Sequence, residues 1–152
     1  MLSQTTEYAL RLVIHLASEE GRPATIQQLA VATRIPAGYL AKVLRQLARA
    51  GIVHSQRGPH GGSVLTRPSG EISVLDVVQA VDPLRRITTC PLGLRTHGVN
   101  LCPLHRRLDD AIEGVERVFR QSSVAELLSD RTGSRPLCES PRAGRQATGG
   151  VE

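Results

Sequence analysis

The chain has 152 residues, of which 40% are hydrophobic and 2% aromatic, and its formal net charge is +5 at pH 7. This length suits one domain with an appended segment, and a core poor in aromatic residues suits packed helices better than a β-sandwich. The basic balance favours polyanionic partners. No apolar run approaches the roughly 20 residues that cross a bilayer, and three unevenly spaced cysteines do not indicate a secreted disulfide framework, so we expect a cytoplasmic protein with no membrane partner.

The first predicted element is an amphipathic helix over residues 5–19, where apolar residues recur at helical spacing. Thr5 or Thr6 would cap its start, and Gly21 with Pro23 would end it. The expected apolar stripe consists of Leu10, Val13, Ile14 and Ala17.

The next segment predicts two helices separated by a tight turn. Thr25 is a natural N-cap for a short helix, and a break is expected before Pro36 because the residue preceding a proline avoids the helical region. The second helix is expected from about Ala37 to Ala50, with Gly51 as the residue that stops it. Its apolar face consists of Leu40, Val43, Leu44 and Leu47.

Two short β-type runs, residues 52–55 and 63–66, flank the loop "QRGPHGGS" and predict a β-hairpin. Ser73 would cap a helix through Ala80, and a long helix is expected from Pro103 to about Ser122, before a short last helix. The long helix has near-heptad apolar spacing, which suits pairing with another helix. Its apolar residues are Leu104, Leu108, Ile112, Val115 and Phe119.

These elements predict a mainly α fold with a small β-hairpin wing, that is, a winged helix-turn-helix plus a long C-terminal dimerisation helix. We assign residues 1–82 to the DNA-binding domain and 83–102 to a cysteine-containing sensor loop. Residues 103–130 would form the dimerisation helix and a short terminal helix, and the polar segment 131–152 is expected to be disordered.

A short helix, a turn, a second helix and a hairpin follow one another in winged helix-turn-helix proteins, whose second helix enters the major groove of double-stranded DNA. Arginine at the tip of a glycine-rich hairpin can enter the minor groove, where the negative potential is enhanced. We expect base contacts near the start of the second helix and phosphate contacts further along it. The expected DNA-binding residues are Thr25, Tyr39, Lys42, Arg45, Arg49, Arg57 and His60.

Two further classes of function are weighed against DNA binding. An enzyme is not expected, because the chain offers no Ser/His/Asp order, no P-loop and no convincing pair of carboxylates near a histidine. A protein-interaction module would use the same winged helix as a scaffold. We therefore predict no catalytic residues and no small-molecule substrate.

The stretch "TTCPLGLRTHGVNLCPLH" at residues 88–105 brings Cys90 and Cys102 into one loop with His97 and His105. A disulfide is disfavoured in a reducing compartment unless it acts as a redox switch. Zinc could use these four side chains, although the separation of the two cysteines is not a zinc-finger spacing. The loop could also hold an iron–sulfur cluster, or contain no cofactor at all.

The segment "GYLAKVLRQLARAGIVHSQRGPHGGSVL" resembles the winged-helix motif of the Rrf-type bacterial transcriptional regulators, and the resemblance extends from Met1 to about Asp130. It implies a homodimer on an inverted-repeat operator, with the first and the long C-terminal helices at the dimer interface. Arg57 matches the arginine that enters the minor groove. Ala41 and Lys42 replace a base-reading pair, so the operator sequence does not follow from the resemblance.

The resemblance also implies a cofactor. Three residues match ligands of cluster-binding members at the same spacing, namely Cys90, Cys102 and His105. One further cysteine of that pattern is missing. Glu7 matches an acidic ligand that one member takes from the first helix of the other subunit, and His97 could take the place of Glu7 as the fourth ligand. A 2Fe-2S cluster is therefore the implied cofactor, while zinc, redox thiols or a loop without cofactor stay open.

Overall fold

The computed structural model describes residues 2–94 and 100–130. The expected tail, residues 131–152, and His97 lie outside these ranges. The mainly helical fold with one antiparallel hairpin is confirmed. In chain order the elements are α1 (Gln4–Ser18), α2 (Ile26–Thr33), α3 (Ala37–Arg49), β1 (Val53–Gln56), β2 (Gly62–Leu65), the 3-10 turn η1 (Ser69–Glu71), α4 (Val74–Val81), α5 (Pro103–Gln121) and α6 (Val124–Ser129).

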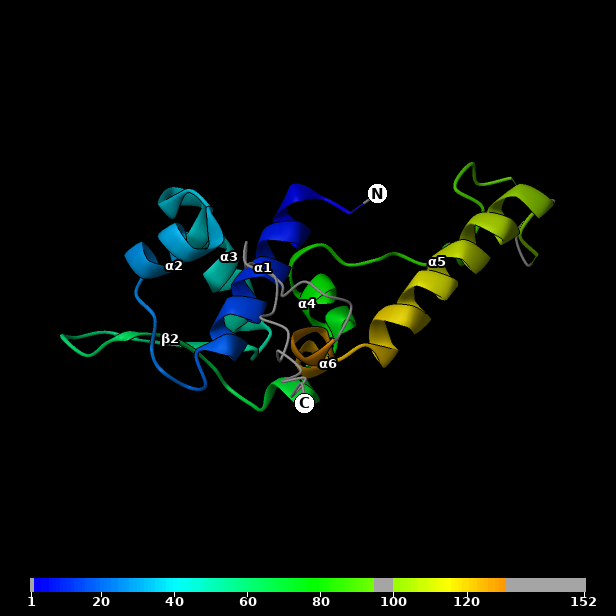
Figure 1. Cartoon of the computed structure of the whole chain (residues 1–152). Coiled ribbons are helices and arrows are strands. Elements are labelled where there is room, and N and C mark those ends of the chain that lie inside the picture. The colour runs from blue at the N-terminus through cyan, green and yellow to red at the C-terminus, as the bar shows by residue number, and fades with distance from the viewer. Residues whose placement is uncertain (1, 95–99, 131–152) are drawn as a thin grey trace, which may run out of the picture.

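Helix α1 runs through the centre of the molecule (Figure 1). It begins after Ser3, whose hydroxyl accepts a hydrogen bond from the backbone N–H of Thr6 at 3.3 Å, so the predicted cap at Thr5 or Thr6 is wrong. The predicted stripe is also rotated, since Leu10 and Ile14 are only partly buried. The fully packed face consists of Ala9, Leu12, Val13 and Leu16. Apolar residues surround much of this helix, so the helices packed against it determine which of them face the core.

Capping residues, a proline and a glycine define the ends of the two helices in the helix-turn-helix, as predicted. Thr25 caps α2 in a capping box with Gln28, each side chain bonding the other residue's backbone N–H. Arg34 ends α2 in the left-handed region, and α3 starts directly after Pro36. Gly51, with φ of +70°, follows the end of α3. The predicted apolar face of α3 is buried, namely Leu40, Val43, Leu44 and Leu47.

The hairpin is tied to the segment that precedes α2. Its strands pair in antiparallel register from Val53 with Leu65 to Gln56 with Gly62. The backbone of Ser63 also exchanges hydrogen bonds with Ala24, at 2.8 and 3.1 Å. The hairpin root is thereby fixed against the entry to α2.

The chain after α5 returns to the core. Val74 donates its backbone N–H to Ser122 at 2.8 Å, and Val124 donates to Ile72 at 2.9 Å. Ser73 caps α4 in a capping box, as expected, and Ser123 caps α6 in the same way. Val124 is fully buried in the same core as α1, so α6 packs against the winged helix. The sequence instead groups this segment with the long helix that precedes it.

Helix α5 has 19 residues, none of them buried, and projects from the helical core on the side opposite the hairpin (Figure 1). A polar cluster joins α5 to the segment that follows α4. Arg86 donates two hydrogen bonds of 2.7 Å to the carboxylate of Asp109 and a third, of 3.1 Å, to Glu113. The backbone N–H of Ile87 also donates to Asp109 at 2.7 Å. The segment after α4 is thereby attached to the middle of α5.

Candidate nucleic-acid interface

The outer side of α3 presents a row of basic side chains. Lys42, Arg45 and Arg49 are all exposed, and their spacing of three and four residues places them on one helical face. The opposite face anchors the helix in the core through four buried aliphatic side chains. A rigid helix with one basic flank can enter a DNA groove and contact phosphates and base edges.

The hairpin tip supplies a second basic element. Arg57 and His60 are both exposed between β1 and β2. The turn is tight: Gly61 donates its backbone N–H to Gly58 at 2.9 Å, and a Cβ on Gly61 would lie 2.5 Å from the Gln56 carbonyl oxygen. The glycines are thus required for the shape that holds Arg57 at the tip.

The side chain of Tyr39, expected from the sequence to contact DNA, is directed toward α1. It does not stand away from the packed side, because its hydroxyl shares a hydrogen bond of 2.6 Å with the hydroxyl of Thr5 on α1. Its ring meets that of Tyr8 edge to face, with centroids 5.4 Å apart. The ammonium of Lys42 lies 5.5 Å from the Tyr39 ring centroid, within the range of a cation–π contact. The Tyr39 ring, held by its hydrogen bond to α1, therefore provides a contact for the Lys42 ammonium group.

Sequence reasoning missed Thr5 and Tyr8 as supports of the basic face. Thr5 and Tyr8 are three residues apart and therefore lie on one side of α1. Nothing in the sequence indicates which other helix that side contacts. Gln46 of α3 also faces a neighbouring helix: its side-chain amide donates to the Val81 carbonyl of α4 at 3.3 Å. Thr25 is exposed, yet its hydroxyl already accepts the capping hydrogen bond from Gln28.

The cysteine loop brings together only part of the expected ligand set. Cys102 Sγ lies 3.3 Å from His105 Nδ1 at the start of α5. Cys90 is 7% exposed, and neither Cys90 nor Cys102 is in a disulfide. Over residues 2–94 and 100–130, no three His, Cys, Asp or Glu side chains are placed to hold one metal ion.

Glu7 lies on α1 in an ion pair with Arg11, whose Nε donates to its carboxylate at 2.7 Å. Arg11 also donates to the Thr33 carbonyl at 3.2 Å, so this pair connects α1 to the end of α2. The structure therefore joins Cys102 to His105 but does not bring three of the expected ligands within residues 2–94 and 100–130 of one chain around a single metal ion.

The strong shifts of pKa in the described ranges occur where the segment after α4 meets the middle of α5. The guanidinium of Arg86 and the backbone N–H of Ile87 lower the pKa of Asp109 from 3.8 to about 2. The same hydrogen bonds to Asp109 raise the pKa of Arg86 above its ordinary value. This ion pair is structural, because it joins the connecting segment to α5 and lies outside the basic face of α3.

Comparisons with known proteins agree with this geometry. A family model described as "Rrf2: Iron-dependent Transcriptional regulator" matches residues 2–130. A protein of Aquifex aeolicus (strain VF5) named as an HTH-type transcriptional regulator is 25% identical over 132 residues, covering 85% of this chain and 92% of that protein.

Two solved structures show the same fold. The oxidized form of Staphylococcus aureus CymR is 25% identical, with a TM-score of 0.66, over 86% of this chain and 97% of that one. The IscR protein of T. potens is 22% identical, with a TM-score of 0.68, over 84% of this chain and 85% of that one.

The family match spans all of the described residues, and it supports DNA binding through the winged helix. The relatives are transcriptional regulators, so this is a non-enzymatic protein. No helix within residues 2–94 and 100–130 is long and apolar enough to cross a membrane. The chain belongs to the Rrf2 family of transcriptional regulators.

Proposed function

We propose that this protein is a cytoplasmic homodimer that binds an inverted-repeat operator and regulates transcription. The observation that supports this most directly is the exposed row of Lys42, Arg45 and Arg49 on α3, with Arg57 at the tip of the neighbouring hairpin. Each subunit would place α3 in a major groove and Arg57 in an adjacent minor groove. His60 and the N-terminus of α2 at Thr25 would lie at the edge of the same contact.

The proposed dimer forms through α5. Large apolar side chains stay exposed along this helix: Leu104 is 64%, Leu108 47%, Val115 41% and Val118 56% exposed. Residues spaced in this way form a seam that pairs with another helix, and none of the 19 residues of α5 is buried by the described part of its own chain. A two-fold dimer also matches two half-sites about one helical turn apart.

The DNA-binding proposal is tested with a duplex selected from random sequence by the full-length protein. The Lys42→Ala and Arg57→Ala variants should each weaken binding about tenfold or more, because a lost base or phosphate contact costs on the order of 1–3 kcal/mol. Arg22→Ala removes the same charge from an exposed position outside α3 and the hairpin, and should bind as the unsubstituted protein does. Equal affinities for all four proteins, with no decrease as salt rises, would contradict the proposal.

A second function rests on one contact. We propose that the loop between α4 and α5 senses redox state, nitric oxide or iron–sulfur status, and the 3.3 Å contact of Cys102 with His105 supports this. The family resemblance supplies the nature of the cofactor, a 2Fe-2S cluster. Cys90, and Glu7 of the partner subunit, would have to join the Cys102–His105 pair to hold it.

This sensing function is tested by anaerobic purification, visible spectroscopy and assays of iron and sulfide. The unsubstituted protein should contain both elements, and Cys102→Ala should lose them while it still binds the selected duplex. A colourless, iron-free protein after anaerobic preparation would remove the cluster and leave the DNA-binding proposal intact.

A further inference from the structure

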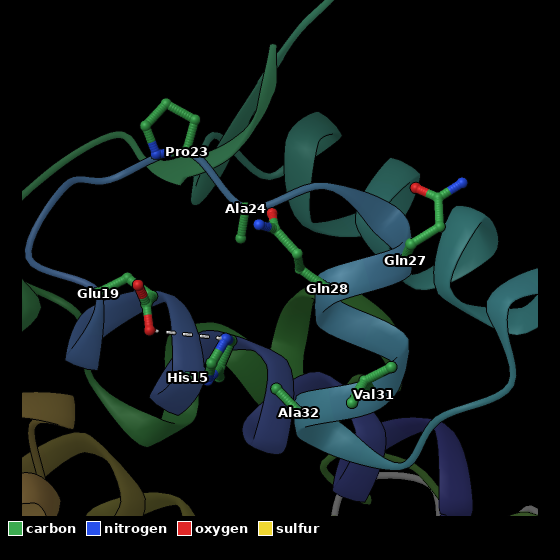
Figure 2. A pocket seen from close by; sticks show the side chains of 8 residues that line it. All are labelled: His15, Glu19, Pro23, Ala24, Gln27, Gln28, Val31 and Ala32. Carbon is green, nitrogen blue, oxygen red and sulfur yellow. Dashed lines mark ion pairs between the residues drawn. The ribbon is translucent and has the colours of Figure 1, made fainter. Parts of the chain in front are cut away.

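A cavity of about 520 Å³ lies between the C-terminal half of α1, the connection that follows it, and α2 (Figure 2). Its volume is within the range of sites that hold small organic ligands, roughly 300–1,000 Å³. Polar groups from both helices and an apolar wall line it. Its lining includes His15, Glu19, Ala24, Gln28, Val31 and Ala32.

The lining of this cavity contains one acidic side chain, although the net charge of the whole protein is positive. Glu19 is the one carboxylate among its lining residues, and no lysine or arginine lines it. Glu19 has two partners at ion-pair distance, since His15 Nε2 lies 3.9 Å and Arg22 Nη2 3.5 Å from its carboxylate oxygens. Charge-assisted hydrogen bonds are about 2.7–2.9 Å long, so the carboxylate retains the capacity to accept a closer donor.

The other side of the cavity is apolar and uncovered. Val31 is 82% exposed, although it is a large aliphatic side chain, and Ala32 lies next to it on α2. Figure 2 shows both side chains on α2, with Ala32 next to His15 of α1 and Val31 farther from Glu19. A ligand with a positive end and a short aliphatic body would pair its charge with Glu19 and remove Val31 from water.

One residue that lines the cavity also pairs with the hairpin proposed to bind DNA. Ala24, which lines it, exchanges two backbone hydrogen bonds with Ser63 of β2. The contact is close, since a Cβ on Gly62 would lie 2.9 Å from the Ala24 backbone. A ligand that displaces Ala24 would therefore move the root of the hairpin, and α2 with it.

We propose that this cavity binds a small aliphatic ammonium ion and that its occupancy changes DNA affinity through the Ala24–Ser63 pairing. The ammonium group donates to the Glu19 carboxylate, and the hydrocarbon part lies against Ala32 and Val31. The effector site is separate from the cysteine loop, so the proposal goes beyond the proposed function.

Binding is tested without DNA, by titrating the full-length, ¹⁵N-labelled protein with n-butylamine hydrochloride, and with 1-butanol as the uncharged probe, at constant ionic strength. Saturable shifts are expected at the backbone amides of Ala24, Val31 and Ala32 with butylamine, and at least tenfold weaker binding with butanol. Glu19→Gln should weaken amine binding at least tenfold. Glu20→Gln, an equal charge change at a residue that does not line the cavity, should leave it unchanged.

Shifts that do not saturate at millimolar amine, or equal binding by the Glu19→Gln and Glu20→Gln variants, would overturn the site. Coupling is then measured as the affinity for the selected duplex at fixed salt with and without butylamine, which should differ at least threefold in the unsubstituted protein and not in Glu19→Gln. Equal affinities would overturn the coupling. Failure of DNA binding itself would be seen in the absence of amine, so it is distinguishable from failure of this proposal.

Discussion

The hydroxyl groups of Thr5 and Tyr39 lie 2.6 Å apart and join α1 to the first turn of α3. The ammonium nitrogen of Lys42 lies 5.5 Å from the centroid of the Tyr39 ring. The Tyr39 ring therefore connects α1 to the basic row on α3 that we propose contacts DNA.

Tyr39→Phe should lower the free energy of unfolding by about 1 kcal/mol, because it removes a partly buried hydrogen bond between two helices. Urea denaturation measures this. Tyr8→Phe is the matched control, since the Tyr8 hydroxyl only accepts from Gln4 one turn away on an exposed surface. A loss in Tyr8→Phe as large as in Tyr39→Phe would show that the interhelical bond adds no special stability.

Leu108→Glu should convert the protein to a monomer, because it places a charge in the apolar seam of α5. Sedimentation velocity at micromolar concentration measures the change, and affinity for the duplex should fall because only one half-site is held. Val31→Glu introduces the same charge at an exposed valine of α2 and should remain dimeric. A dimeric Leu108→Glu protein would exclude this seam.

Stability should decrease at acidic pH because of Asp109. The folded-state pKa of about 2 is below the ordinary value of 3.8, so the unfolded chain binds the proton more readily. The Arg86–Asp109 contribution is fully present above about pH 4 and is lost as pH falls toward 2. Asp109→Asn should therefore show a shallower decline between pH 5 and pH 2.5 in urea denaturation. Asp110→Asn, at the exposed neighbouring position, should follow the unsubstituted protein.

Gly62→Ala should lower the free energy of unfolding by about 1–3 kcal/mol, because its Cβ would lie 2.9 Å from the Ala24 backbone. The hairpin root would shift, and affinity for the selected duplex should fall as well. Gly114→Ala is the control of opposite sign. No atom lies within 4 Å of the added Cβ inside α5, and alanine favours the helix by about 0.5–1 kcal/mol. Destabilisation of equal size in both variants would contradict the close approach at Gly62.

The helix boundaries could be predicted because their causes are local. Thr25, Ser73 and Ser123 each satisfy a backbone N–H three residues ahead, and Pro36 and Gly51 act on their immediate neighbours. Arg57 could be placed at a hairpin tip for the same reason, since the glycines around it allow only a tight turn. Ser3 was missed as the cap of α1 because three residues close together, Ser3, Thr5 and Thr6, all have the side chains that caps require.

The sequence by itself determined where most of the helices begin and end, the start of α1 excepted, and that α3 has one apolar and one basic side. The tertiary structure alone decided which face of α1 is buried, that Tyr39 and Gln46 turn toward neighbouring helices, and that α6 returns to the core. The physical reason is the range of the forces involved. Caps and turns satisfy groups within about four residues, whereas the rotation of a helix depends on apolar surface supplied by segments far away in the chain.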